Sequence, residues 1–243
     1  MTSPFLSIII PAHNEERRLP HALEQIFSFL EKQPYSAEVW VVENGSSDRT
    51  YAIAQEFARR YPHLRPLQVE QRGKGLAVQR GMLTAEGEYR FLCDADLSMP
   101  ITEVNRFLPP ALTDFDIAIG SREAPGAVRY NEPAYRHWGG RAINLIIRLL
   151  ALPGLRDTQC GFKCFRAEVA HDIFRFQTFS GISFDPETLY IARRRGYRIV
   201  ELPIPWYFDP ESRIHLLKDT LSLLRDLLVI RRNARRGLYD PNP

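Results

Sequence analysis

The sequence has little cysteine and no long apolar run. Only Cys93, Cys160 and Cys164 occur among 243 residues, and three is too few for a disulfide framework, so we expect a reducing compartment. Cys160 and Cys164 stand four residues apart without a histidine cluster nearby, which argues against a zinc site. No stretch of 18 apolar residues exists, so no membrane-spanning helix is predicted. Residues 1–4 lead directly into a strand-like run, and no targeting signal is expected.

A strong excess of either charge is also missing. The formal net charge is +3, which is too small to indicate a nucleic-acid partner. The hydrophobic fraction of 44% and the charged fraction of 25% are ordinary for a globular protein and exclude overall disorder. The basic excess lies at the end of the chain, where seven Lys and Arg residues from Arg213 onward accompany three acidic ones.

The first 120 residues alternate between two periods. Short apolar runs of strand length alternate with segments whose apolar residues recur at helical spacing. Unbroken apolar strands are buried on both faces, and their alternation with helices indicates parallel βαβ units. We therefore predict an α/β fold with a Rossmann-like, mostly parallel central sheet flanked by helices. The predicted strands are 5–11, 39–42, 64–69, 89–93 and 115–119, with helices at about 19–30, 46–60, 75–84 and 102–108 between them.

The second half of the chain is less regular. Residues 123–133 contain Gly126 and two prolines and are predicted to form a mobile loop. Residues 157–165 form a polar and aromatic stretch without a predicted element. Three prolines between residues 203 and 210 mark an extended linker. Helices are predicted at 135–152, 186–195 and 212–232, and a strand at 197–202.

Polar clusters follow four of the predicted strands. Ligands of open α/β sheets bind outside the carboxyl ends of the strands, so these clusters are expected to converge on one crevice. The alternative is that they are polar only because loops are polar. The clusters are His13-Asn14-Glu15-Glu16, Glu43-Asn44-Gly45-Ser46, Asp94-Ala95-Asp96 and Ser121-Arg122-Glu123.

Asp94 and Asp96 form the sharpest local signal. Residues i and i+2 of an extended chain point to the same side, so the two carboxylates form a hard oxygen site. Such a site suits Mg²⁺ or Mn²⁺ that also keeps substrate phosphate oxygens as ligands. The alternative is a loop pair that caps a helix. The position directly after a buried strand favours the metal.

Gly73-Lys74-Gly75 begins a predicted helix. It matches neither the Walker A pattern nor a dinucleotide fingerprint, so an ATPase or an NAD enzyme is not indicated. Lys74 at a helix N-terminus is placed to meet a phosphate. A solvated lysine is the alternative.

Several motifs together resemble a known family. Pro11-Ala12-His13-Asn14-Glu15, Glu43-Asn44-Gly45-Ser46, Arg72-Gly73-Lys74-Gly75 and Asp94-Ala95-Asp96 resemble, in order and spacing, the family-2 inverting glycosyltransferases of GT-A fold. The later motifs are similar to the dolichyl- and polyprenyl-phosphate branch, above all to the dolichyl-phosphate beta-glucosyltransferases. The resemblance covers roughly residues 7–232. These later motifs are Gly120-Ser121-Arg122, Arg156-Asp157-Thr158-Gln159-Cys160-Gly161-Phe162-Lys163, Phe184-Asp185-x-Glu187 and Glu211-Ser212-Arg213.

The resemblance implies roles for individual residues. On the donor side, it implies that Pro11, His13, Glu15 and Glu43 line the base and ribose pocket. Asp94 is then placed near the ribose or a Mg²⁺ or Mn²⁺ ion, and Asp96 binds that metal and the diphosphate. The same donor-binding set includes Lys74, Ala95 and Arg213.

On the acceptor side, the resemblance implies that Arg122 and Arg136 face a lipid phosphate. Asp157 is the candidate acceptor-side carboxylate, either as a base or as a positioning group, with a purely structural ion pair as the alternative. Two positions depart from the family pattern, because Glu43-Asn44 stands where Asp-Asp is usual and Ser98 stands where many relatives place Gln.

The implied reaction is a metal-dependent, inverting transfer of a hexose, glucose first, from a nucleotide sugar to a polyprenyl or dolichyl phosphate. UDP-glucose is the first expected donor and GDP-mannose the second. A phosphate acceptor is already anionic at neutral pH, so in-line placement matters more than a strong base. Two alternatives stay open: a soluble glycosyltransferase acting on a small molecule or glycan, and a nucleotide-sugar-binding module without catalysis.

The end of the sequence predicts contact with a membrane. Residues 211–243 are predicted to form an amphipathic helix with a basic tail, following a glycosyltransferase domain at 1–210. A wide apolar face flanked by arginines is typical of helices in a membrane interface. Packing of this helix against the domain is the alternative, and the helix at 135–152 is open to the same two interpretations. The expected location is therefore cytoplasmic, peripheral on the inner face of the membrane.

Overall fold

The structure is a computed structural model that describes residues 3–210 and 216–240, without the side chains of Arg136 and residues 216–221. Its centre is a seven-stranded sheet in the order β3-β2-β1-β4-β7-β5-β8. All neighbouring strands are parallel except β7, which runs antiparallel to both β4 and β5. The strands are β1 Leu6–Ala12, β2 Ala37–Asn44, β3 Leu64–Val69, β4 Tyr89–Cys93, β5 Ile117–Ser121, β7 Phe162–Arg166 and β8 Ile199–Pro203.

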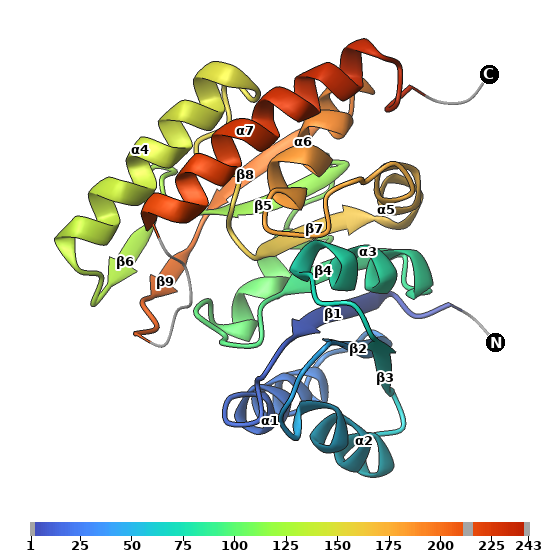
Figure 1. The fold of residues 1–243 in the computed structure, drawn as a ribbon. Helices are drawn as coiled ribbons and strands as arrows, with labels where there is room; N and C mark the ends of the chain where they lie inside the picture. The colour runs from blue at the N-terminus through green and yellow to red at the C-terminus, as the bar shows by residue number, and fades with distance from the viewer. Residues whose placement is uncertain (1–2, 211–215, 241–243) are drawn as a thin grey trace.

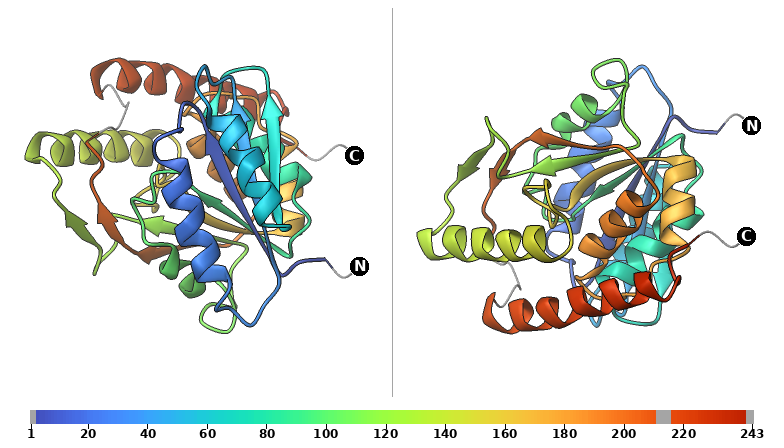
Figure 2. Two further views of the ribbon diagram at one scale, coloured as in Figure 1. Left: turned by 90° about the horizontal axis from the view of Figure 1, so that it is seen from below. Right: turned by 90° about the horizontal axis from the view of Figure 1, so that it is seen from above.

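Helices cover both faces of this sheet (Figures 1 and 2). One hydrophobic cluster lies between the sheet and α1 (Leu19–Leu30), α2 (Thr50–Arg60) and the 3₁₀ helix η1 (Ile101–Phe107). A second cluster lies on the opposite face. It contains residues of α3 (Lys74–Thr84), α5 (Ala167–Phe174) and α6 (Phe184–Arg194).

Strand β1 shows why the apolar runs of the sequence are unbroken. Ile8 and Ile10 point into the cluster with α1, whereas Ile9 points into the cluster with α3, and all three are fully buried. Alternate residues of a strand face opposite sides, so a strand covered on both faces needs apolar residues at every position. The predicted α/β fold with a mostly parallel central sheet is confirmed.

The second half differs from the prediction in three places. The predicted mobile loop at 123–133 contains β6 (Val128–Tyr130), and the predicted linker contains β9 (Pro205–Tyr207). These two strands pair in parallel as a separate ribbon. The stretch at 157–165 leads into β7, and α5 follows it. The prediction of a loop and a linker was wrong because both strands have only three residues and pair across more than 70 positions.

Helices α4 (Ala134–Leu150) and α7 (Leu216–Arg235) run side by side along one side of the molecule (Figure 1). In α7, Leu223, Leu227 and Ile230 are buried in the same cluster as the strands of the sheet. This part of the helix therefore packs against the domain. The domain boundary at residue 210 stays a prediction, and Arg213 lies outside the described residues. Within the described ranges, no helix is long and apolar enough to cross a bilayer.

The last described turn is anchored in the core. Tyr239 is fully buried, and its hydroxyl donates a hydrogen bond of 2.8 Å to Glu187 on α6. The Glu187 carboxylate also accepts hydrogen bonds from the Thr178 hydroxyl and from the backbone amides of Thr178 and Phe179. Glu187 thus ties the end of α7 to the segment that precedes α6.

Candidate active site

The loops that follow β1 and β2 are joined by hydrogen bonds. The backbone amide of Asn14 donates to the Ser46 hydroxyl at 3.0 Å, and the Asn14 side-chain oxygen accepts from the amide of Ser47 at 2.8 Å. The amide of Glu15 donates to the Thr50 hydroxyl at 2.7 Å. Two of the four predicted polar clusters therefore lie together at the carboxyl edge of the sheet.

The residues expected around the base and ribose are placed in these loops. Pro11 and Glu43 are buried in β1 and β2, and the Glu43 carboxylate accepts a hydrogen bond from the amide of Ser46. The ring of His13 lies 2.8 Å from the carbonyl of Asn44. None of these three lines the cavity described next. Their assignment to a nucleotide pocket stays a prediction.

A cavity lies at the carboxyl ends of β4 and β5. Among the residues predicted for the site, Lys74, Asp94, Asp96 and Arg122 line it. The cavity therefore combines side chains from the end of β4, the start of α3 and the end of β5, as expected for the carboxyl edge of such a sheet. Ala95 is buried between the two acids. The side chain of Arg136 is among those the structure does not describe.

Asp94 and Asp96 both face this cavity. Asp96 accepts a hydrogen bond of 2.9 Å from the amide of Ser98. Burial and the neighbouring charge of Asp94 raise the pKa of Asp96 above its ordinary value. The loop depends on Gly161, since a Cβ atom there would lie 1.9 Å from an Asp94 carboxylate oxygen.

Lys74 forms an ion pair with Asp94. Its ammonium nitrogen lies 2.7 Å and 2.9 Å from the two carboxylate oxygens. Burial alone would lower the pKa of Lys74, but the charges of Asp94 and Asp185 outweigh burial and hold it above its ordinary value. The residues on either side of Lys74 have to be glycines. Cβ atoms at Gly73 and Gly75 would lie 2.6 Å from the carbonyl oxygens of residues 180 and 179, respectively.

A buried lysine lies behind the cavity, and the sequence analysis assigned it no role. Lys163 on β7 pairs with Asp185 on α6, and its ammonium also donates to the carbonyl of Cys160 at 2.6 Å. Burial raises the pKa of Asp185, although Lys163 and Lys74 oppose the shift. Asp185 lines the cavity. Both residues stand in motifs of the resemblance, Lys163 at the end of residues 156–163 and Asp185 in Phe184-Asp185-x-Glu187, but neither was given a role.

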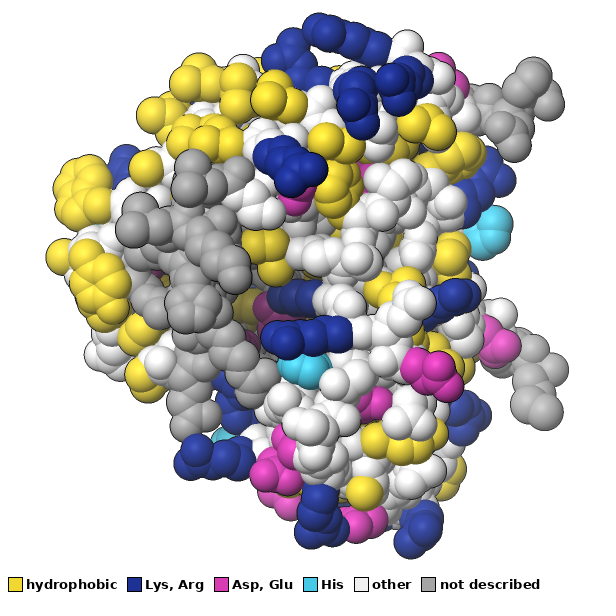
Figure 3. Space-filling view, viewed as in Figure 1, with side chains coloured by type: hydrophobic (Ala, Val, Ile, Leu, Met, Phe, Trp, Pro, Cys, Tyr) yellow, Lys and Arg dark blue, Asp and Glu magenta, His cyan; other side chains and the backbone are white. Residues whose placement is uncertain are grey.

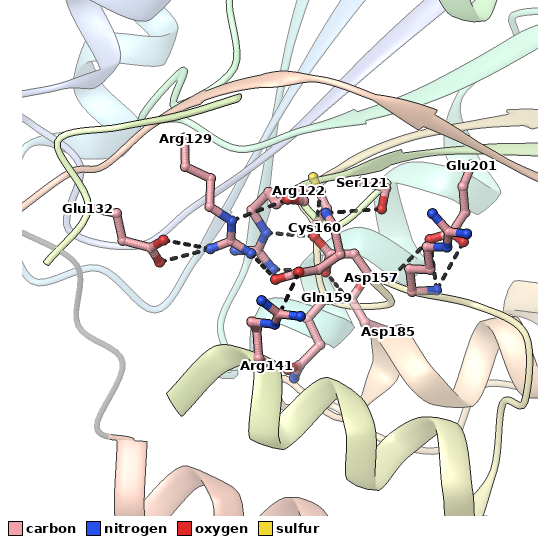
Figure 4. A network of polar contacts seen from close by, with 12 residues as sticks. Ser121, Arg122, Arg129, Glu132, Arg141, Asp157, Gln159, Cys160, Asp185 and Glu201 are labelled. Carbon is pink, nitrogen blue, oxygen red and sulfur yellow. Dashed lines mark hydrogen bonds and ion pairs between the residues drawn. The ribbon is translucent and has the colours of Figure 1, made fainter. Parts of the chain in front are cut away.

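Arg122 is held by Asp157 through two parallel hydrogen bonds of 2.7 Å and 2.9 Å (Figure 4). Asp157 also accepts the backbone amide of Arg122 at 3.0 Å. Burial alone would raise the pKa of Asp157, but the Arg122 guanidinium lowers it to about 2. Asp157 is fully buried and does not line the cavity. A buried, ion-paired carboxylate of this kind is typical of a positioning group or of a purely structural ion pair, and the role of Asp157 stays a prediction.

Arg129 is a further basic residue of the cavity that the sequence analysis missed. It lies on β6, within the segment predicted to be a loop. Two carboxylates hold it: that of Glu123, and that of Glu132 at 2.8 Å (Figure 4). The guanidinium groups of Arg122 and Arg129 lie 5.5 Å and 5.8 Å from the centre of the Trp206 ring. Trp206 thus brings β9 into the site.

The wall of the cavity toward α4 and α7 is apolar. Gly140 and Ile143 of α4 and Leu223 of α7 line it, together with Ile182. Asn144 is also part of this wall, and its buried side-chain oxygen has no hydrogen-bond partner among the described residues. The cavity is therefore lined by a pair of carboxylates, by two arginines and by an apolar wall.

The residues fit a divalent cation that shares its ligands with a substrate. Two carboxylates provide hard oxygens, and Mg²⁺ commonly binds one or two carboxylates plus substrate phosphates. The described part of the chain has no group of three or more Asp, Glu, His or Cys placed to hold a metal. A cation at Asp94 and Asp96 therefore needs oxygen ligands from another molecule.

Known proteins match this chain along most of its length. The family model described as glycosyl transferase family 2 matches residues 7–174. A dolichyl-phosphate beta-glucosyltransferase of Trichomonas vaginalis is 35% identical over 98% of this chain and 76% of its own length. A human protein of the same name is 32% identical over 96% of this chain and 77% of its own.

Solved structures show the same fold. A glucosyl-3-phosphoglycerate synthase from Mycobacterium tuberculosis, in complex with Mn²⁺, UDP-glucose and phosphoglyceric acid, has a TM-score of 0.64 at 17% identity, covering 98% of this chain and 81% of its own. A mannosyltransferase from Pyrobaculum calidifontis, in complex with GDP-mannose and Mn²⁺, has a TM-score of 0.61 at 21% identity, covering 97% and 65%.

Proposed function

Because this chain belongs to glycosyl transferase family 2, we propose that it transfers glucose from UDP-glucose to a polyprenyl or dolichyl phosphate with inversion at the sugar. The single observation that carries the proposal is the lining of the cavity, which combines an acidic pair, two arginines and an apolar wall. We call the part around Asp94, Asp96 and Lys74 the donor side. The part around Arg122, Arg129 and Trp206 is the acceptor side.

The donor side suits the diphosphate of a nucleotide sugar. Asp94 and Asp96 would hold a Mg²⁺ or Mn²⁺ ion, as their hard oxygens and the need for additional ligands suggest. Such an ion, when bound, supplies positive charge to the diphosphate leaving group. Lys74 lies at the same place and adds a further positive charge.

The acceptor side suits a phosphate monoester attached to an apolar chain. Arg122 presents its guanidinium to the cavity from a rigid bidentate pair with Asp157, so its orientation is fixed before an acceptor arrives. An acceptor phosphate is already anionic, so the reaction does not need the buried Asp157 as a base. The isoprenoid chain would lie along the apolar wall of α4 and α7.

The outer face of α4 is our candidate for contact with the membrane. Tyr135, Trp138, Leu145 and Leu149 are 67%, 67%, 52% and 74% exposed, and their spacing places them on one face of the helix. Figure 3 shows hydrophobic side chains gathered on the side of the molecule where α4 lies. Arg141, which is about half exposed, adds a positive charge of the kind that anionic lipids attract.

A panel of donors and acceptors tests the proposal. The protein with Mn²⁺ is incubated with UDP-glucose, GDP-mannose or UDP-N-acetylglucosamine, each with a short polyprenyl phosphate, with 3-phosphoglycerate or without an acceptor. We expect a lipid-linked sugar from UDP-glucose and the polyprenyl phosphate, and none after Asp96→Asn. Transfer to 3-phosphoglycerate instead would identify a transferase with a soluble acceptor, and absence of any product would contradict the proposal.

A further inference from the structure

The ion pair between Lys74 and Asp94 occupies the position that a metal ion would need. Lys74 approaches both carboxylate oxygens of Asp94, at 2.7 Å and 2.9 Å. A divalent cation that used the same oxygens would lie close to the ammonium group, and two positive charges at that distance repel each other. Either the cation or the lysine can therefore pair with Asp94, but not both in this arrangement.

The charges of the cavity show when a cation can replace Lys74 as the partner of Asp94. Five acidic and three basic side chains line it, so that its formal charge is negative. A nucleoside diphosphate alone would enter against this negative charge, and a cation alone would have to displace Lys74 without giving it a new partner. When the two arrive together, the diphosphate offers both ligands for the cation and an anionic partner for Lys74. The lining side chains are Asp94, Asp96, Glu132, Asp185 and Asp209, with Lys74, Arg122 and Arg129.

We propose that Lys74 couples metal binding to nucleotide binding: it blocks Asp94 in the free enzyme and moves from Asp94 to the diphosphate when the metal and the nucleotide enter together. This inference rests on the proposed function, since it takes a nucleoside diphosphate and a divalent cation as ligands. Lys74 is then a positioning residue whose side chain changes its partner. The side chain is 34% exposed, so its neighbours do not enclose it completely.

The shape of the surrounding backbone supports movement of the side chain rather than of the helix. Gly73 and Gly75 pack so closely against residues 179–181 that no Cβ atom fits at either position. The amide of Leu76, in the first turn of α3, donates a hydrogen bond to the carbonyl of Ser180. The start of α3 is thus fixed in place, and the lysine side chain between the two glycines is the part that can swing.

Binding of Mn²⁺ in the absence and presence of UDP tests the coupling without reference to activity. The free Mn²⁺ signal is followed by electron paramagnetic resonance during titrations of the wild type, Lys74→Met and the control Lys32→Met. Lys32 is an exposed lysine on the surface after α1. A titration of Mn²⁺ with UDP alone corrects for the affinity of the nucleotide for the ion.

We expect the wild type and Lys32→Met to bind Mn²⁺ weakly when UDP is absent. With UDP present, both should bind Mn²⁺ at least about tenfold more tightly, a difference of about 1.4 kcal/mol. Lys74→Met should bind Mn²⁺ alone about tenfold more tightly than the wild type, and UDP with Mn²⁺ about tenfold less tightly. Unchanged Mn²⁺ affinity in Lys74→Met overturns the inference. The wild type alone provides a second test, because equal Mn²⁺ affinity with and without UDP also overturns the inference. A wild type that binds no UDP even with Mn²⁺ instead overturns the proposed function.

Discussion

The donor side and the acceptor side of the cavity differ in where their ion pairs lie. The donor side has the ion pair of Lys74 with Asp94, and both partners line the cavity. The acceptor side rests on ion pairs between segments that are distant in the sequence, such as Arg122 with Asp157. A ligand can therefore exchange with the partners of the donor-side pair, whereas the acceptor-side pair keeps its carboxylate buried and fixes the orientation of Arg122.

The largest expected effect is on the donor side. Asp96→Asn should lower transfer on the order of a thousandfold, because a preorganised charge that stabilises the leaving group is lost. The same variant should unfold at a higher temperature than the wild type. Burial and Asp94 raise the pKa of Asp96, and an acid whose folded pKa is raised lowers the free energy of unfolding as the pH rises through its pKa values.

Activity assays and thermal unfolding at pH 7 check this prediction, with Asp114→Asn as the matched control. Asp114 is exposed and pairs only with Arg198 among the described contacts. An Asp96→Asn variant that keeps its activity would contradict the assignment of the donor side, because the Asp96 charge would then not be needed for transfer.

A glycine on the border of the two sides should show the next largest effect. Gly161→Ala would place a methyl group 1.9 Å from an Asp94 oxygen, so the carboxylate has to move. A displacement of about 1 Å near reacting groups can cost roughly a hundredfold in rate. Gly181→Ala is the control, because nothing lies within 4 Å of its Cβ position. Steady-state rates with varied UDP-glucose measure the effect, and equal rates for the two variants would contradict it.

A substitution on the acceptor side should change the orientation of Arg122 and the stability of the fold. Asp157→Asn leaves Arg122 without its bidentate partner, and breaking a buried ion pair typically costs about 3 kcal/mol in the free energy of unfolding. We expect the KM for the polyprenyl phosphate to rise while the affinity for UDP with Mn²⁺ stays unchanged. A variant that loses donor affinity by the same factor would show that the two sides are not separate.

The same pair should also set a pH dependence. The pKa of Asp157 is lowered to about 2 in the folded protein, against about 4 for an ordinary aspartate. Its contribution to stability is therefore complete above about pH 4 and is lost as the pH falls toward 2. Chemical denaturation at pH 7 and pH 3 should show the difference between wild type and Asp157→Asn shrinking at the lower pH. An equal difference at both values would assign the stability to packing alone.

The smallest expected effect concerns the membrane. Trp138→Ser together with Leu149→Ser removes two exposed apolar groups of α4, and binding to anionic lipid vesicles should fall about tenfold. Transfer to a short, water-soluble polyprenyl phosphate should stay unchanged, since neither residue lines the cavity. Leu228→Ser on α7 is the matched control, because Leu228 is 61% exposed on the other helix. A larger effect of Leu228→Ser would move the membrane contact to α7.

The predictable part of the fold is the part held by local signals. Strands such as residues 89–93 were predicted because a buried strand needs apolar residues throughout, and Asp94 and Asp96 were found because they follow such a strand. Strand β7 was missed, since its place between β4 and β5 depends on contacts with residues more than 40 positions away. Arg129 was missed because its strand β6 pairs with β9 more than 70 positions away, and the pair of Lys163 with Asp185 joins a strand and a helix 22 positions apart. A charged residue reveals its partner only when the fold brings the two together.

Tyr239 has a practical consequence for anyone who shortens this protein. Its hydroxyl is one of the donors that satisfy Glu187, and Glu187 in turn orders Thr178 and Phe179, whose segment presses on the two glycines beside Lys74. A truncation that ends before Tyr239 would leave a buried carboxylate short of a donor. Although such a deletion is remote from the cavity in sequence, its first effect should be a lower affinity for the nucleotide.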